Sequence, residues 1–274
     1  MTTNGAVIYP ARFDAASYVL RATLGGFTAS CTFTAQPGRD YWPVGDSRTD
    51  GASGDGDLLT QLQSCLATHP DALTFIPSVS LTFVGGEPRI QASISAGFIT
   101  LLWEDPATTL DPAVFGFEGS TTPPAGIVTA PSRLPGWWLP GAPLSEDSEL
   151  QDEANIGQSR ALTGRLVTTD FGSTAARRAF GWELLDRSLV KRAASETPAN
   201  TFEHAWVESI RPGRRFRLYE DLARVAAGQG FQTLTTDSLD DPMSRDGQHS
   251  YRWAVNLQTR VAGLATDIDG VVIV

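Results

Sequence analysis

The amino-acid sequence predicts a mainly β protein of the α+β class, with two antiparallel β-sandwich or meander domains that each carry a short helix. Three observations support this prediction. Apolar and polar residues alternate with a period of two in many short segments, the 26 glycines and 17 prolines suit frequent turns, and glycine pairs separate the segments. We expect an N-terminal domain over residues 1–119, an arm or linker rich in proline and tryptophan over 120–153, and a C-terminal domain over 154–274.

The N-terminal domain opens with a predicted β-hairpin. Residues 18–24 and 27–33 alternate in polarity on either side of Gly25-Gly26, a strong signal for a two-residue turn. A short amphipathic helix follows, with Asp55 or Asp57 near its N-terminus. Its apolar face consists of Leu58, Leu59, Leu62, Cys65 and Leu66. Three more strands complete a compact meander, over residues 79–83, 90–94 and 98–103.

Residues 120–144 differ in character, because prolines are frequent and strand alternation stops. Trp137, Trp138 and Leu139 lie near the middle of this stretch. Exposure of two adjacent indoles would be costly, so we expect an extended arm that packs either on its own domain or on a neighbouring molecule. Residues 145–153 are predicted to form an acidic, solvated loop.

The C-terminal domain is predicted to contain several strands and one helix. Phe180, Trp182 and Leu184 fall on one face of a strand, and Asn200 with Glu203 forms a capping box that opens the helix. Its apolar stripe is Phe202, Trp206 and Ile210, and Arg211-Pro212-Gly213 ends it. The predicted strands cover residues 160–168, 178–185, 215–218, 231–234 and 251–261. In the strand over 215–218 we expect Phe216 and Leu218 to point inward and Arg215 and Arg217 outward.

Composition narrows the range of functions. The net charge of −10 and the pI near 4.7 disfavour binding to nucleic acid, because an acidic surface repels phosphates. No basic segment precedes an apolar run at the N-terminus, and no stretch approaches the roughly 20 apolar residues of a membrane helix. Cys31 and Cys65 lie on apolar faces, so we expect reduced core thiols in a protein made in a cytoplasm.

Motifs that would carry chemistry are sparse. Asp267-Ile268-Asp269-Gly270 resembles the first motif of haloacid-dehalogenase-type hydrolases, but only four residues follow it, so we expect a turn before a terminal strand. The loop from Asp46 to Asp57 resembles a calcium loop in part, but Arg48 at the third position and the missing final glutamate favour a solvated turn and helix cap. An adventitious cation among Asp50, Asp55 and Asp57 stays open.

The three histidines are His69, His204 and His249, and none has a partner at metal spacing. No nucleophile elbow, P-loop or dinucleotide fingerprint is present either. We therefore predict no catalytic, cofactor-binding or metal-binding residue, no cofactor and no enzymatic activity.

Basic residues concentrate in the second half of the chain. One group is Arg211, Arg214, Arg215 and Arg217, and a second consists of Arg177, Arg178, Arg187, Lys191 and Arg192. In an acidic protein such a cluster could meet the acidic loop of an identical neighbour, and head-to-tail contacts of that kind close rings. The alternative is a solvated strand edge whose charges block unwanted pairing.

Two stretches resemble minor tail and distal-tail-like baseplate proteins of tailed bacteriophages. The first runs from the strand ending in Phe27-Thr28-Ala29-Ser30 to Val114-Phe115-Gly116-Phe117, and the second includes residues 202–206, 213–221 and 251–253. The resemblance implies a structural protein of the virion tail, assembled in the host cytoplasm as a ring of six or three copies, with other tail proteins as partners and no membrane insertion. The assembly residues that we predict are Trp137, Trp138, Leu139, Arg211, Arg214, Arg215 and Arg217.

Two other functions remain open at this stage. A carbohydrate-binding β-sandwich for recognition of the host surface would use Trp137 and Trp138 for sugar stacking. A hydrolase with a scattered active site would depend on residues such as Asp267.

Overall fold

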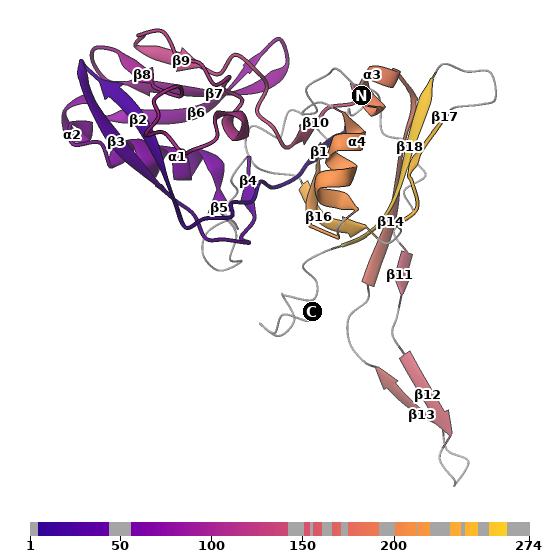
Figure 1. The fold of residues 1–274 in the computed structure, drawn as a ribbon. Helices are drawn as coiled ribbons and strands as arrows, with labels where there is room; N and C mark the ends of the chain where they lie inside the picture. The colour runs from indigo at the N-terminus through magenta and orange to yellow at the C-terminus, as the bar shows by residue number, and fades with distance from the viewer. Residues whose placement is uncertain are drawn as a thin grey trace. The chain divides into compact units, whose positions relative to one another are not determined.

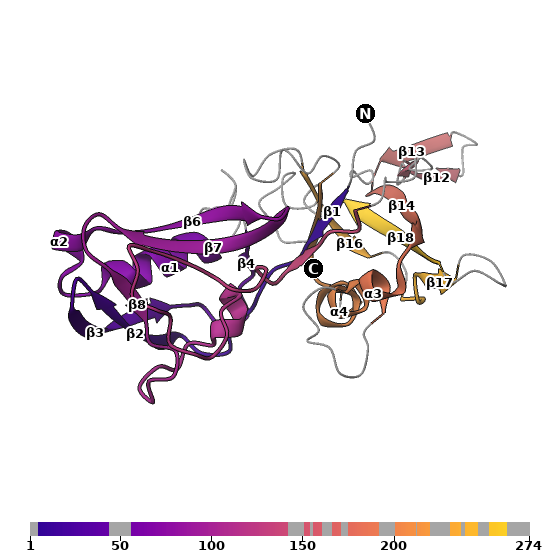
Figure 2. The same ribbon diagram turned by 90° about the horizontal axis from the view of Figure 1, so that it is seen from above.

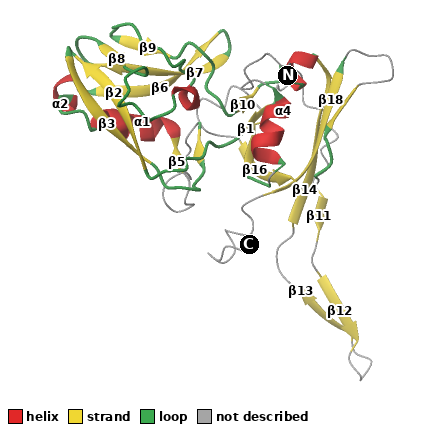
Figure 3. Ribbon diagram, viewed as in Figure 1, coloured by secondary structure: helices red, strands yellow, loops and turns green. Residues whose placement is uncertain are grey.

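The computed structural model confirms the predicted fold class: strands account for 42% of the chain and helical segments for 17% (Figure 3). It describes residues 5–43, 56–141, 151–153, 156–160, 166–170, 175–191, 201–211, 213–219, 231–236, 239–245 and 252–261.

The chain forms two compact units, and one of them interrupts the other in sequence. The inserted unit comprises Ile8–Trp137 with Ala223–Gln229, and the discontinuous unit comprises Met1–Val7, Trp138–Leu222 and Gly230–Val274. This division differs from the expected boundaries at residues 119 and 153. The N-terminal strand β1 (Ala6–Ile8) belongs to the large sheet of the second half, and residues up to Trp137 complete the first unit.

Two three-stranded antiparallel sheets make up most of the inserted unit (Figure 1). One has the order β3-β2-β8 and the other the order β6-β7-β9. The predicted hairpin turns are present, and the glycines in both have positive φ: 58° and 103° at Gly25 and Gly26, 61° and 84° at Gly85 and Gly86. The strands are β2 (Ser17–Leu24), β3 (Phe27–Thr34), β6 (Pro77–Val84), β7 (Glu87–Ile94), β8 (Ile99–Leu101) and β9 (Ile127–Thr129). Smaller elements are β4 (Tyr41–Trp42), paired in parallel with β5 (Gly56–Asp57), α2 (Ala72–Phe75) and the 3-10 helix η1 (Pro112–Phe115).

The helix α1 (Leu58–Ala67) packs against β3 and β6, the outer strands of the two sheets, and Figure 2 shows it between them. Asp57 caps it as predicted, since the Asp57 carboxylate accepts a hydrogen bond from the Thr60 N–H at 2.9 Å. Its buried face is Leu58, Leu62, Cys65 and Leu66.

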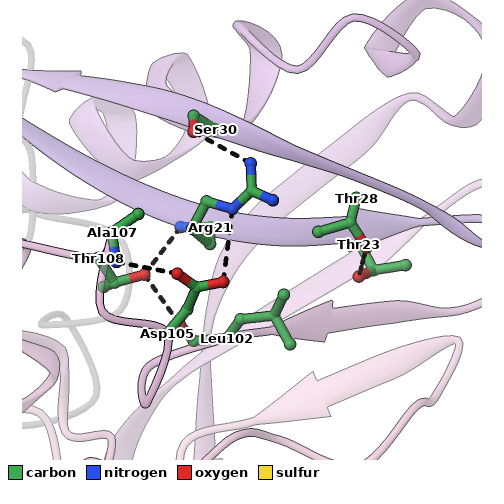
Figure 4. Close-up of polar contacts among 8 residues, drawn as sticks. All are labelled: Arg21, Thr23, Thr28, Ser30, Leu102, Asp105, Ala107 and Thr108. Atoms are coloured by element: carbon green, nitrogen blue, oxygen red, sulfur yellow. Dashed lines mark hydrogen bonds and ion pairs between the residues drawn. The ribbon is translucent and has the colours of Figure 1, made fainter.

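The segment after β8 runs along β2 and is fixed there by a polar network (Figure 4). The Thr108 hydroxyl accepts from the Arg21 N–H at 3.0 Å and donates to the Leu102 carbonyl at 2.8 Å. The Arg21 guanidinium donates to Ser30 Oγ at 3.2 Å and lies 3.5 Å from the Asp105 carboxylate. These contacts cover an otherwise open edge of β2 beyond the short strand β8.

The discontinuous unit is built on an eight-stranded sheet with the path β10-β1-β15-β16-β18-β14-β11, and β17 pairs with β18 beside it. The strands other than β1 are β10 (Trp137–Trp138), β11 (Gln151–Glu153), β14 (Ala175–Leu185), β15 (Phe216–Tyr219), β16 (Phe231–Thr236), β17 (Met243–Arg245) and β18 (Trp253–Val261). Two short helices, α3 (Arg187–Val190) and α4 (Phe202–Ala205), lie on one face of this sheet, and α4 continues as the π-helix η3 (Trp206–Ile210) (Figures 1 and 2).

Three local predictions for this unit are wrong. Leu184 is 66% exposed, because the ladder between β14 and β18 has a bulge between Trp182 and Leu185 that turns Leu184 outward with φ of 57°. Thr201, not Asn200, caps α4, and its hydroxyl accepts from the His204 N–H at 3.3 Å. The strand expected over 160–168 is replaced by two strands, β12 (Ile156–Arg160) and β13 (Leu166–Asp170).

Candidate assembly site

The paired tryptophans are core residues of the chain, which corrects their predicted role as assembly contacts. Successive side chains of a strand point to opposite faces, and β10 places Trp137 and Trp138 in different surroundings. Trp137, 0% exposed, meets the Phe83 ring edge-on at 6.3 Å within the inserted unit. Trp138, 1% exposed, packs edge-on against Trp182 and Phe202 at 5.0 and 4.9 Å within the discontinuous unit. Neither indole has surface left for a neighbour, whereas Leu139 is half-buried.

The members of the arginine cluster differ in exposure. Arg211 is exposed at the end of η3, and Arg214 and Arg215 are half-buried. Arg217 is only 3% exposed, so the prediction that it points outward from β15 is wrong. The reason is that all four residues of β15 are buried, so both faces of this strand are covered, and not only the face of Phe216 and Leu218.

The hairpin formed by β12 and β13 was not predicted from the sequence. Five residue pairs join the two strands, from Ile156↔Asp170 to Arg160↔Leu166. The strands that precede and follow it, β11 and β14, also pair with each other, from Gln151↔Arg177 to Glu153↔Ala175. Among the described residues β12 and β13 pair only with each other, so both outer edges of this two-stranded sheet carry backbone groups that a further strand could pair. The sequence feature that indicates a strand here is the run Val167, Thr168 and Thr169, three residues that favour β structure.

Lys191, the only lysine, ties several elements of the discontinuous unit together. Its ammonium lies 3.5 Å from Glu203 of α4, 3.7 Å from Asp241 before β17, and 5.7 Å from the centre of the Trp253 ring of β18. The Arg245 guanidinium also approaches the Trp253 ring, at 5.8 Å. Lys191 therefore has a structural role rather than one in a surface patch.

The remaining candidates give no reactive centre within the described part of the chain. His69 is buried, and its Nδ1 accepts from the Asp71 N–H at 3.1 Å. His204 is half-buried on α4. Within the described ranges, no group of three or more His, Cys, Asp or Glu side chains could hold a metal ion, and no helix is long and apolar enough to cross a membrane. His249, Asp46 to Asp55, Arg192 and Asp267 to Gly270 lie outside the described residues.

A groove on the inserted unit is lined by residues between Phe117 and Pro131. Its polar groups are mainly hydroxyls, those of Ser120, Thr121, Thr122 and Thr129, and Glu118 is its carboxylate. The Thr122 hydroxyl is already engaged, because it accepts from the Leu101 N–H at 2.8 Å. This lining offers no nucleophile with an adjacent base.

Neither the protein-family models nor the curated proteins contain a match to this chain.

Proposed function

We propose that this chain is a structural protein of a bacteriophage tail tip or baseplate, which acts by assembling with copies of itself and with neighbouring tail proteins. The resemblance of residues 27–117 and 202–253 to minor tail and distal-tail-like proteins suggests the class. One structural observation supports it best: among the residues that the structure describes, β12 and β13 pair only with each other, which leaves both outer edges for a further strand.

An isolated two-stranded hairpin is at best marginally stable in water, whereas three or more paired strands are stable. The β12–β13 hairpin would gain that stability if a strand of a neighbouring subunit paired with either edge, a mode of association known as β-augmentation. A hairpin that reaches from each subunit to the next gives a head-to-tail contact, and such contacts close into a ring when the rotation between subunits allows it.

The runner-up, a carbohydrate-binding module, loses its main support. It relied on sugar stacking by Trp137 and Trp138, but both indoles are buried in the protein core.

The test is the mass of the purified full-length chain by light scattering at several concentrations, with negative-stain imaging. We expect closed rings of identical copies. A variant in which a Gly-Ser-Gly linker replaces residues 156–170 should be a folded monomer or small oligomer, with an unchanged thermal transition. Leu239→Ser, at an exposed position in the same unit, is the control and should leave the rings intact.

Rings that persist without the hairpin would refute its role in assembly. The virion part of the proposal is tested separately by mass spectrometry of purified particles of a phage that encodes this chain. Absence of the chain from those particles would refute that part.

A further inference from the structure

Four separate segments of the inserted unit meet at one end, around the ring of Phe75. The Gly25 N–H donates to the Phe98 carbonyl at 2.9 Å, and Ser95 donates from both its N–H and its hydroxyl to the Phe75 carbonyl, at 2.8 and 2.9 Å. The Phe75 ring lies against Gly25 so closely that a Cβ there would be 2.0 Å from it. The Ile94 N–H donates to the Gly126 carbonyl at 3.3 Å. The β2–β3 turn, α2, the β7–β8 turn and the start of β9 are therefore neighbours, and Figures 1 and 2 show α2 at this end of the unit.

Large apolar side chains project from this surface. Each of the four segments contributes at least one, and Leu73 of α2 is 95% exposed. We call this set the apolar pole, and it consists of Phe27, Leu73, Ile76, Phe98 and Ile127. Ile76 also has φ of 38°, a value that a β-branched residue rarely adopts. Large exposed apolar side chains that gather on neighbouring segments of a soluble protein often mark a contact site.

The segments that carry the apolar pole are themselves uncharged. Residues 22–38, 72–86, 90–103 and 119–132 include no Asp, Glu, Lys, Arg or His, although 19% of the chain is Asp, Glu, Lys or Arg and its net charge is −10. The nearest charged residue on α2 is its N-terminal neighbour Asp71.

We propose that the apolar pole is a two-fold contact between two copies of this chain. In a two-fold contact the same patch meets itself, so a patch of one charge would repel its copy, whereas an uncharged apolar patch is self-complementary. For a protein of net charge −10, this surface places fewer like charges at the contact than the rest of the chain would.

A lipid surface fits the apolar pole less well than a second copy does. The pole contains no Trp or Tyr, the residues that favour the interface of a bilayer, and no Lys or Arg to attract anionic headgroups. The contact adds to the proposed assembly but does not depend on it, because the pole lies on the inserted unit and the hairpin on the discontinuous unit.

The test compares four forms of the full-length chain by sedimentation velocity across a range of concentrations: unmodified, Leu73→Glu, Leu73→Lys, and the control Leu239→Glu. Leu73 and Leu239 are both largely exposed, so the substitutions should not impair folding. We expect Leu73→Glu and Leu73→Lys each to weaken pairing at least tenfold, and Leu239→Glu to have no effect. An equimolar mixture of the Glu and Lys variants should restore pairing, because opposite charges then meet across the two-fold axis.

Two results would overturn the proposal. One is an association that is the same in the Leu73→Glu variant and the unmodified chain. The other is an unmodified chain that does not pair but floats with phosphatidylcholine vesicles, with flotation lost in Leu73→Glu, because the occupant is then lipid. If removal of residues 156–170 changes nothing while Leu73→Glu abolishes pairing, the contact at the apolar pole stands and the hairpin contact fails.

Discussion

At the scale of single residues, the pair Trp137-Trp138 shows how one strand can supply two different cores. Both indoles are buried, but their polar atoms differ. Trp138 Nε1 donates to the Leu189 carbonyl at 2.8 Å. Trp137 Nε1 is buried and has no hydrogen-bond partner among the described residues. The two positions therefore form a matched pair for measuring that hydrogen bond.

We predict that Trp138→Phe destabilises the protein more than Trp137→Phe, by about 1–2 kcal/mol. Both substitutions remove the same volume, but only the first leaves the Leu189 carbonyl without its donor, and the second removes an N–H whose burial is unfavourable. Urea unfolding followed by circular dichroism measures the difference. Equal losses would show that the Trp138 hydrogen bond contributes nothing net.

The two cysteines give a prediction with a defined pH range. Burial raises the pKa of Cys31 to about 11 and raises that of Cys65 still further, whereas an unfolded chain ionises its thiols near pH 9. The folded state thus keeps its protons to a higher pH than the unfolded state. The stabilisation from these neutral thiols is complete below about pH 9 and is lost as the pH rises from 9 towards 11.

We therefore expect the urea midpoint to fall above pH 9, and to fall less steeply in Cys31→Ala than in the unmodified chain. A thiol reagent at pH 8 should label neither cysteine in the folded protein and both in 8 M urea. Rapid labelling of the folded protein would contradict the burial of both thiols.

At the scale of elements, α1 protects an edge of each sheet in the inserted unit. The Gln63 side chain acts like a short strand beside β6: its amide nitrogen donates to the Pro77 carbonyl at 2.7 Å, and its oxygen accepts from the Val79 N–H at 2.6 Å. On the other side, the Thr68 hydroxyl accepts from the Thr32 N–H of β3 at 2.8 Å. Edge groups that would otherwise be open to a foreign strand are thereby satisfied within the unit.

Substitution Gln63→Leu should lower the free energy of unfolding by about 1–3 kcal/mol, because two backbone groups of β6 lose their partners. Gln61→Leu, on the same helix and without these hydrogen bonds, is the matched control and should change stability by less than about 0.5 kcal/mol. Chemical denaturation of both variants provides the measurement. Equal effects would mean that water replaces Gln63 at this edge without loss.

The elements that the sequence predicted best are those whose pattern is local. The hairpin around Gly25-Gly26, the helix capped by Asp57 and the β6–β7 hairpin follow from alternation, turn chemistry and capping alone. Leu184 and Arg217 were misplaced because a bulge, and the covering of both faces of a strand, depend on residues far away in the chain. The same reason explains why Trp138, predicted as an assembly contact, is a core residue, and why the pairing of β12 with β13 alone among the described strands was not predicted. Neither feature can be inferred from neighbouring residues in the sequence.

At the scale of the whole molecule, the main departure from the sequence prediction is the order of the units along the chain. The strand β1 has only three residues, Ala6 to Ile8, which is too short for a recognisable strand pattern. The sequence therefore does not indicate that it joins a distant sheet. The boundary expected at residue 119 also removes β9, which pairs with β7 from Gln91↔Thr129 to Ser93↔Ile127. The ends of the inserted unit are adjacent, because the Tyr9 N–H donates to the Gly136 carbonyl at 2.8 Å.

These observations predict that a fragment of residues 8–137 folds by itself, while a fragment of residues 1–119 does not fold stably. The first keeps both sheets, α1 and the contact between Tyr9 and Gly136 that closes its ends. The second leaves the β7 edge unpaired and lacks the buried side chains of Val128, Leu134 and Trp137. Scanning calorimetry of both fragments is the measurement, and a single cooperative transition is expected only for residues 8–137.

If both fragments melt cooperatively at similar temperatures, residues 120–137 are dispensable and the inserted unit ends at the boundary predicted from the sequence. If neither does, the inserted unit needs the discontinuous unit in order to fold, and the two are not separate folding units.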